Sequence, residues 1–143
     1  MIPPMRKIKE VATFKNLDHF LDYVRLFFKE KSLNVDLLQD ITLVIEELLV
    51  NIILYSYPKG NIGEVELSLL LLDNNLKINI TDNGIPFNPL KHLTPDISLP
   101  LKQRGIGNLG IHLVKSLVDK IKYERKTEKN FLTLFKTVNS YEK

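Results

Sequence analysis

The stretch LVIEELLVNIILYSY, residues 43–57, decides the fold, because it forms the second half of the longest helix that the sequence predicts. This helix is expected to begin at a cap on Asn34 and to carry apolar residues along one face. Residues 48–54 (LLVNIIL) are aliphatic except for Asn51. A buried amide without hydrogen-bond partners costs on the order of 1–3 kcal/mol. The question is therefore which partner retains Asn51 there, one helical turn after Glu47.

Other regular elements are expected on both sides of this helix, from the spacing of apolar residues and from turn signals. In chain order they are a strand over 7–13, helices over 16–31 and 34–57, strands over 64–72 and 76–81, an irregular stretch over 83–104, a helix over 107–119, and strands over 121–126 and 130–138. Antiparallel neighbours with segregated helices predict an α+β fold. We expect a two-layer sandwich of a mixed, mostly antiparallel sheet with three main helices on one face.

The bulk composition is typical of a single globular domain, which we expect to span residues 1–143. The 44% hydrophobic and 26% charged residues are ordinary, and the chain has no cysteine for a disulfide or a thiolate metal site. No apolar run reaches the roughly 18 residues of a membrane span. The net charge of +3 comes from scattered basic residues without an aromatic-interleaved basic motif. We therefore expect a cytoplasmic protein that binds neither nucleic acid nor membranes directly, and nucleic-acid binding stays open as a minor alternative because of the basic pI of about 9.0.

Glu47 and Asn51 form the first candidate motif, because residues at i and i+4 share one helix face. An amide oxygen is a suitable ligand for Mg²⁺, and a carboxylate one turn away can polarise an attacking hydroxyl or water. The alternative is an amphipathic helix whose polar edge happens to carry both residues. The apolar neighbours of Asn51 favour the functional interpretation.

The second motif is ITDNGIPFNP, residues 80–89. Asn-Gly after an alternating strand is typical of a hairpin, but Pro86 and Pro89 are poorly tolerated in a partner strand. Gly84 is then expected to let the backbone leave the sheet and approach a ligand closely. Asp82, at the end of the strand, is placed to accept a hydrogen bond from the exocyclic amino group of a base.

The third motif is RGIGNLGIHLVK, residues 104–115, in which three glycines satisfy G-x-G-x-x-G. The surrounding βαβ unit of a dinucleotide fingerprint and the signatures of protein kinases are missing from the sequence. A glycine-rich loop that opens onto a helix N-terminus favours phosphate binding. The alternative is a flexible loop with a helix cap. The proline-rich stretch over 83–104, between the second and third motifs, is expected to be a lid over the ligand.

Together the three motifs resemble the ATP-binding domain, or Bergerat fold, of DNA gyrase, the large heat-shock chaperone, histidine kinases and mismatch-repair ATPases. ELLVNIILYSYP is similar to the N-box of that superfamily, TDNGIPFNP to its G1 box, and GIGNLGIHLVKSLVD to its G2 box. The resemblance spans about residues 8–136. Within the superfamily the chain is most similar to the small stand-alone anti-sigma-factor serine kinases, and we expect it to lack a phosphoacceptor helix and a transducer domain.

The resemblance implies a role for each matching residue. Glu47 would be the general base, and Asn51 would bind the Mg²⁺ that bridges the ATP phosphates. Asp82 would accept a hydrogen bond from the adenine amino group, with Gly84 giving the base room. The other residues implied to contact the nucleotide are Gly105, Gly107, Leu109 and Gly110 around the phosphates, Lys115 through its charge, and Thr133 as an indirect adenine contact.

The resemblance also implies partners. An ATP-dependent serine kinase of this type would phosphorylate a small anti-sigma-antagonist-type protein, bind a sigma factor and form a homodimer. Two positions depart from the pattern, because Tyr55 stands where the family often has histidine and Asn108 where it often has glycine. These departures keep open an alternative, an ATP-gated protein-interaction module that lacks useful kinase activity.

Overall fold

One antiparallel sheet of five strands forms the first layer of the protein. The structure, a computed structural model, describes residues 7–92 and 110–138. The strands are β1 (Lys7–Val11), β2 (Glu64–Leu72), β3 (Asn75–Asp82), β4 (Lys120–Lys126) and β5 (Lys129–Thr137). Their order across the sheet is β1-β2-β3-β5-β4, and each described pairing is antiparallel.

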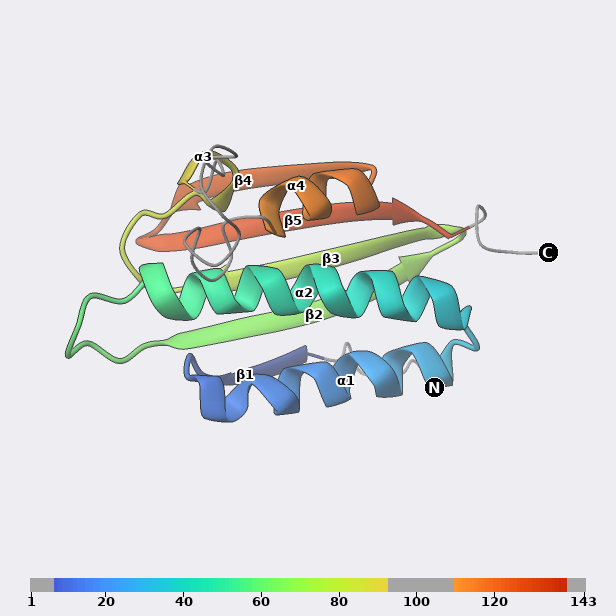
Figure 1. The fold of residues 1–143 in the computed structure, drawn as a ribbon, viewed down its shortest axis with the longest axis horizontal. Helices are drawn as coiled ribbons and strands as arrows, with labels where there is room; N and C mark the ends of the chain where they lie inside the picture. The colour runs from blue at the N-terminus through green and yellow to red at the C-terminus, as the bar shows by residue number, and fades with distance from the viewer. Residues whose placement is uncertain (1–6, 93–109, 139–143) are drawn as a thin grey trace, which may run out of the picture.

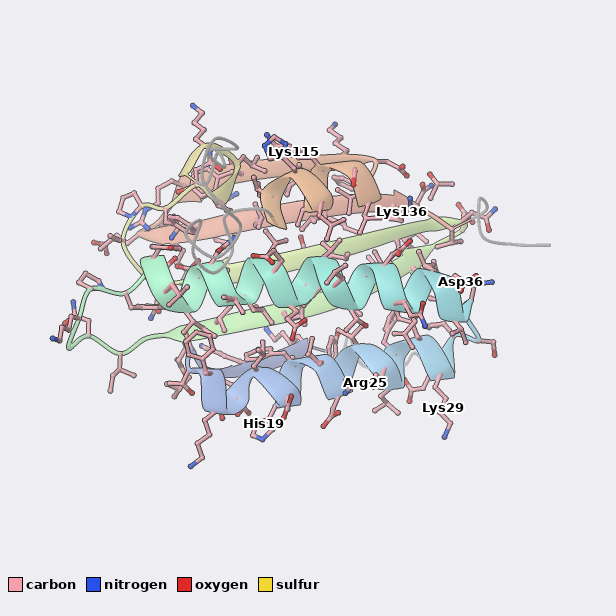
Figure 2. The ribbon with its side chains drawn as sticks, viewed as in Figure 1. His19, Arg25, Lys29, Asp36, Lys115 and Lys136 are labelled. Atoms are coloured by element: carbon pink, nitrogen blue, oxygen red, sulfur yellow. The ribbon has the colours of Figure 1, made fainter. Side chains whose placement is uncertain are left out.

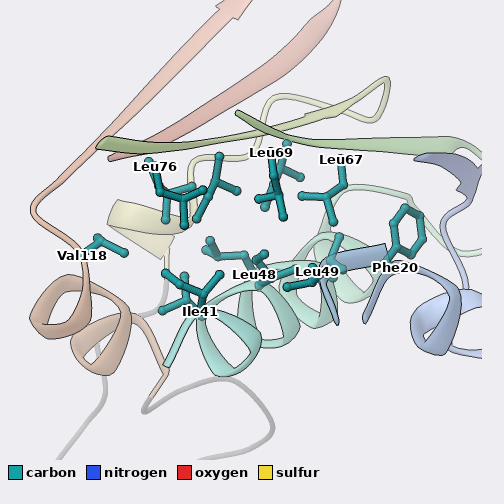
Figure 3. Close-up of a cluster of buried hydrophobic side chains, with 14 of the residues drawn as sticks. Phe20, Ile41, Leu48, Leu49, Leu67, Leu69, Leu76 and Val118 are labelled. Carbon is teal, nitrogen blue, oxygen red and sulfur yellow. The ribbon is translucent and has the colours of Figure 1, made fainter. Parts of the chain in front are cut away.

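The helices form the second layer, on one face of this sheet (Figures 1 and 3). The longer ones are α1 (Leu17–Glu30), α2 (Val35–Tyr55) and α4 (Gly110–Leu117), and the short ones are the 3₁₀ turn η1 (Phe14–Asn16) and α3 (Pro89–His92). α2 lies between α1 and α4 in the helix layer (Figure 1). The expected α+β two-layer sandwich is confirmed. None of the described helices is long and apolar enough to cross a membrane.

The core lies between the two layers (Figure 3). Alternate residues of the strands point toward the helices, as the period of two in a strand requires. These inward residues are Val65, Leu67 and Leu69 of β2, Leu76, Ile78 and Ile80 of β3, and Leu132 and Leu134 of β5. They pack against the apolar stripe of α2, whose buried members include Leu37, Ile41, Val44, Ile45, Leu48, Leu49 and Ile52. The helix spacing expected from the sequence is confirmed.

The ends of α2 follow from local chemistry. Asn34 caps the helix, since its side-chain oxygen accepts hydrogen bonds from the backbone N–H groups of Asp36, at 2.7 Å, and Leu37, at 3.3 Å. The helix ends at Tyr55, and Ser56 completes the last turn through its backbone N–H. α2 is 21 residues long, and its polar residues Glu47 and Asn51 lie in its C-terminal half.

Two loop details bear on the sequence expectations. A two-residue turn joins β2 to β3, with Asp73 in the left-handed region at φ 55°. The stretch expected to be irregular contains the short helix α3. The Asn88 side chain accepts a hydrogen bond from the backbone N–H of Leu90 at 2.9 Å, and Pro89 occupies the first helical position. Asn-Pro is therefore a helix start that the sequence analysis did not use.

Candidate functional site

Asp82 and Asn130 form a buried polar pair at one end of the core. Asp82 is the last residue of β3 and lies opposite Asn130 of β5 in the sheet register. Each is only 3% exposed. The Asn130 amide nitrogen donates a hydrogen bond to Asp82 Oδ1 at 2.9 Å, and the backbone N–H of Gly84 donates to the same oxygen at 2.9 Å. Burial raises the pKa of the Asp82 carboxyl, and these two hydrogen bonds oppose that shift.

Asn130 also holds the loop that follows β3. Its amide nitrogen donates to the carbonyl oxygen of Ile85 at 2.8 Å. Its oxygen accepts from the backbone N–H of Phe87 at 3.2 Å and from the Tyr123 hydroxyl at 2.5 Å. A longer contact of 3.3 Å comes from Arg125 Nη1. One asparagine therefore ties together the end of β3, the loop beyond it and the edge strand β4.

Gly84 is where this loop passes under the C-terminal end of α2. A Cβ atom on Gly84 would lie 2.2 Å from the carbonyl oxygen of Ser56, so no larger residue fits without a backbone shift. The same carbonyl accepts a hydrogen bond from the backbone N–H of Ile85 at 2.8 Å. The guanidinium of Arg125 donates to the carbonyl oxygen of Gly84 at 2.7 Å. The glycine at this position is thus required by close packing of the loop on the helix.

Glu47 and Asn51 form a second buried group, one turn apart on α2. Asn51 is fully buried, and within the described residues neither its amide oxygen nor its amide nitrogen has a hydrogen-bond partner. The same is true of Oε2 of Glu47. Such groups are rare because each leaves a desolvation cost of about 1–3 kcal/mol. Among the described residues, these groups therefore have room for a partner that those residues do not supply.

Gly110, the first residue of α4, packs directly on Glu47. A Cβ atom on Gly110 would lie 1.9 Å from the carboxyl carbon of Glu47, so the glycine makes room for that side chain. Burial raises the pKa of Glu47, and the charge of Glu46 raises it further. The N-terminus of α4, the positive end of the helix dipole, therefore lies beside a carboxyl that holds its proton more tightly than usual.

Aromatic side chains connect the two polar groups. Tyr55 continues the row of Glu47 and Asn51 along α2. Its ring packs against that of Phe87, with the centroids 5.7 Å apart and the planes tilted by 33°. Phe87 is in turn held by Asn130 through its backbone N–H. The helix row and the loop after β3 thus belong to one site.

A pocket of about 600 Å³ opens beside this site. It is lined by Ser56, Tyr57, Pro58, Asn61, Ile62, residues 83–86, Arg125 and residues 127–129. Neither Glu47 nor Asn51 lines it, so it borders the loop after β3 without containing the unpartnered groups. We place the candidate site at the buried polar groups, where the chemistry is, and regard this pocket as the outer side of the loop.

Five of the residues that the sequence pointed to fall into two groups, which the Tyr55–Phe87 ring contact connects. Glu47 and Asn51 lie one turn apart on α2 with Gly110 packed on Glu47, and Asp82 is bonded to Gly84. The structure does not bring in Thr133, whose hydroxyl contacts Asn79 at 3.3 Å on the opposite face of the sheet. Lys115 is exposed, on the side of α4 away from α2 (Figure 2). Gly105, Gly107, Asn108 and Leu109 lie outside the described residues.

Asn130 is the residue that the sequence analysis missed. The alternation of β5 carried a usable signal, because Leu132 and Leu134 are apolar and therefore face inward, which puts residue 130 inward as well. A polar residue at an inward position of a strand is a candidate for a buried network.

The arrangement suits a ligand with an amino-bearing base at one end and a metal-bound polyphosphate at the other. Asp82 offers a carboxylate acceptor, and the N-terminus of α4 favours anions. The described residues contain no cluster of three or more His, Cys, Asp or Glu side chains that could hold a metal by themselves. The single free amide oxygen of Asn51 instead fits Mg²⁺, which keeps most of its ligands as water and substrate phosphate.

Comparison with known proteins identifies similar sequences. A family profile described as "Histidine kinase-like ATPase domain" matches residues 11–136. The serine/threonine-protein kinase BtrW of Bordetella bronchiseptica is 28% identical over 94 residues, which cover 66% of either chain. The serine-protein kinase RsbW of Bacillus thuringiensis is 34% identical over 90 residues, which cover 60% of this chain and 56% of that one. The match thus spans less than two thirds of these relatives' length.

Solved structures show the same fold. The RsbU and RsbW domains of a Mycobacterium tuberculosis protein match 95% of this chain and 32% of that chain, with a TM-score of 0.64 and 16% identity. The catalytic domain of the histidine kinase ThkA matches 94% of this chain and 97% of that chain, with a TM-score of 0.53 and 17% identity. At these identities the likeness concerns the fold alone.

Proposed function

Because the chain belongs to the family of histidine kinase-like ATPase domains, we propose that it is an ATP-dependent serine protein kinase that acts on a small anti-sigma-antagonist-type protein. The names of the similar curated proteins, BtrW and RsbW, support the kinase activity and the serine acceptor. The observation that carries the proposal is the fully buried, unpartnered amide of Asn51, one turn after Glu47.

In this proposal Asn51 is the protein's ligand to Mg²⁺, and the ion neutralises charge on the ATP phosphates when it is bound. The amide oxygen then gains the partner that it lacks within the described residues. Binding of the ion would then offset the desolvation cost of the buried amide. This explains why an asparagine occupies a helix position surrounded by aliphatic residues.

Glu47 is the general base. The serine hydroxyl of the substrate attacks the γ-phosphorus, its proton passes to the Glu47 carboxylate, and ADP leaves. Burial and the neighbouring Glu46 raise the pKa of Glu47, which makes the carboxylate a better proton acceptor than an exposed one. Gly110 keeps the side chain in place, because its missing Cβ leaves the space that the carboxyl group occupies.

Asp82 and Gly84 bind the base end of the nucleotide. Asp82 accepts the hydrogen bond of the exocyclic amino group, and the loop at Gly84 forms the wall of the base pocket. The N-terminus of α4, which begins at Gly110, would hold the phosphates. We further propose that residues 105–109 complete the phosphate site and that residues 83–104 act as the lid, in one domain of residues 1–143.

We also propose that the protein is cytoplasmic, forms a homodimer and binds a sigma factor when the antagonist is unavailable. A second function, an ATP-gated interaction module without useful transfer, is favoured by one observation. Tyr55 packs on Phe87, and this ring contact would transmit a ligand-induced change in the loop after β3 to α2. In that case ATP would order the docking surface and no phosphoryl group would be transferred.

The test compares two neighbouring carboxyl groups. Glu47→Gln and Glu46→Gln are incubated with radiolabelled ATP, Mg²⁺ and purified anti-sigma-antagonist-type proteins, and phosphoserine is measured beside wild type. Removal of the base should lower transfer by about 10²–10⁴-fold in Glu47→Gln, with ATP binding retained. Glu46→Gln should transfer within a few-fold of wild type. Undiminished transfer by Glu47→Gln contradicts its role, and ATP binding without transfer to any antagonist favours the interaction module.

A further inference from the structure

We propose that Asn130 is the positioning residue of the base pocket: it occupies one oxygen of Asp82 and leaves the other as the acceptor that selects an amino-bearing base. This rests on the proposed function, because Asp82 must be the residue that reads the base. Asn130 itself is placed by its contacts with the loop after β3 and with β4, and it need not touch the nucleotide.

The orientation of the Asn130 amide is fixed by its neighbours. The backbone N–H of Phe87 and the guanidinium of Arg125 are donors only, and both approach Oδ1, at 3.2 and 3.3 Å. The carbonyl oxygen of Ile85 is an acceptor only and lies 2.8 Å from Nδ2. Reversing the amide would place two donors against a nitrogen and two oxygens against each other. The nitrogen must therefore face Asp82.

This orientation decides how Asp82 presents its carboxyl group. Oδ1 accepts from Asn130 Nδ2 and from the backbone N–H of Gly84, both at 2.9 Å, so it carries no proton. The Ser56 hydroxyl is near the same carboxyl group without meeting the geometry of a hydrogen bond. No hydrogen bond to Oδ2 is found among the described residues, so this oxygen remains as the acceptor for a ligand. A base with an exocyclic amino group can donate a hydrogen bond to Oδ2. A base with a keto oxygen at the same position would place two acceptor oxygens against each other.

The same amide couples base recognition to the loop. Its contacts with Ile85 and Phe87 close the loop into the conformation in which Gly84 donates to Asp82. Tyr123 and Arg125 support the amide from β4, and Arg125 also binds the carbonyl oxygen of Gly84. Replacing the amide donor of Asn130 by an acceptor should therefore alter both the base selectivity and the position of the loop after β3.

The first test replaces the donor by an acceptor of equal size. Asn130→Asp would place a second carboxyl group against Asp82 Oδ1, and the two would have to share a proton. The matched control is Asn79→Asp, the same change on the neighbouring strand at a position that faces away from the core. Affinities for ATP and for inosine triphosphate, whose base carries a keto oxygen, are measured by calorimetry at pH 6 and pH 8.

Wild type and Asn79→Asp should prefer ATP over inosine triphosphate by about 10- to 100-fold, the range of one hydrogen bond to a charged group. Asn130→Asp should lose at least about tenfold in ATP affinity at pH 8 and recover part of it at pH 6, where the shared proton is present. An equal loss at both pH values, or ATP affinity like that of Asn79→Asp, overturns the proposal.

A second variant covers the case in which Asn130→Asp does not fold. In Asp82→Asn the oxygen must still face Asn130 Nδ2 and the Gly84 N–H, so the new amino group points to the base. The preference should then shift toward inosine triphosphate, whereas a preference for ATP that persists overturns the positioning role. If wild type itself binds neither nucleotide, or binds both equally, the proposed function fails. If wild type prefers ATP and the variants behave like the control, only the role of Asn130 fails.

Discussion

Two buried polar groups lie at the same end of the core, and they differ in how well they are satisfied. Asp82 and Asn130 are joined to each other and to the surrounding loop by hydrogen bonds from both strands. Glu47 Oε2 and both amide atoms of Asn51 have no partner within the described residues. Under the proposed function, the first group is organised before ATP binds, and the second gains its partner when Mg²⁺ and ATP bind. In this proposal, buried polar groups hold the loop in one place and bind the ligand in the other.

The largest effect should come from breaking the satisfied group. Asn130→Leu removes every side-chain hydrogen bond of Asn130 and leaves the Asp82 carboxyl without its amide donor in a buried place. The free energy of unfolding should fall by about 3 kcal/mol or more. Urea denaturation of the variant and wild type measures the difference. A loss under about 1 kcal/mol would mean that the network contributes little.

The two glycines next to these groups should differ in the same way. Gly84→Ala places a Cβ against a backbone carbonyl, which cannot move aside cheaply, so the free energy of unfolding should fall by about 1–3 kcal/mol. Gly110→Ala instead meets the side chain of Glu47, which can rotate. Its stability should change by less than about 1 kcal/mol, and phosphoryl transfer should fall about 100-fold because the base is displaced. Equal losses of unfolding free energy in Gly84→Ala and Gly110→Ala would contradict this difference between a backbone contact and a side-chain contact.

The same kind of substitution at Asn51 should raise the free energy of unfolding instead of lowering it. Asn51→Leu is the same substitution as Asn130→Leu, but it removes an amide that has no hydrogen-bond partner among residues 7–92 and 110–138. The free energy of unfolding should rise by about 1 kcal/mol in the absence of ligand, and binding of Mg²⁺-ATP should be lost. Urea denaturation and calorimetry together measure both effects. Destabilisation of more than about 1 kcal/mol would show that Asn51 has a structural partner.

A smaller effect concerns pH. Burial raises the pKa of Asp82 above its ordinary value of 3.8, so the folded chain holds this proton more tightly than the unfolded chain. Its contribution to stability is present below pH 3.8 and is lost as the pH rises through the higher, folded-state pKa. The Asp82→Asn variant lacks this dependence. Its stability relative to wild type should therefore increase from about pH 4 toward neutrality. A decrease over that range would mean that the pKa of Asp82 is lowered, not raised, in the folded state.

The smallest effect is expected at Thr133. Its hydroxyl contacts Asn79 on the face of the sheet opposite to Asp82. Thr133→Val should change stability by no more than about 0.5 kcal/mol and should leave ATP affinity within about twofold. Calorimetry on this variant beside Asn130→Asp shows which of the two residues supports the base pocket. A tenfold loss of ATP affinity in Thr133→Val would show that Thr133 supports the base pocket.

Much of the fold could be predicted from the sequence, because it depends on local patterns. Residues close in sequence determine the alternation of the strands, the apolar stripe of α2 and the cap at Asn34. Asp82 and Asn51 stood out because a polar residue at a strand end or among aliphatic residues needs a partner. Asn130 was missed because its pairing with Asp82 joins residues 48 positions apart, which no local pattern fixes. The inward position of residue 130 followed from the alternation of β5 but was not used.

The most direct test of the central claim is calorimetric titration of ATP, with Mg²⁺ and with EDTA, into wild type, Asn51→Leu and Asp82→Ala. The account predicts Mg²⁺-dependent binding by wild type and loss of that binding in Asp82→Ala. It also predicts that Asn51→Leu is at least as stable as wild type but no longer responds to Mg²⁺. Folded wild type that binds no ATP, or Asn51→Leu that keeps the full Mg²⁺ dependence, would contradict the assignment of the unpartnered amide to the metal-nucleotide site.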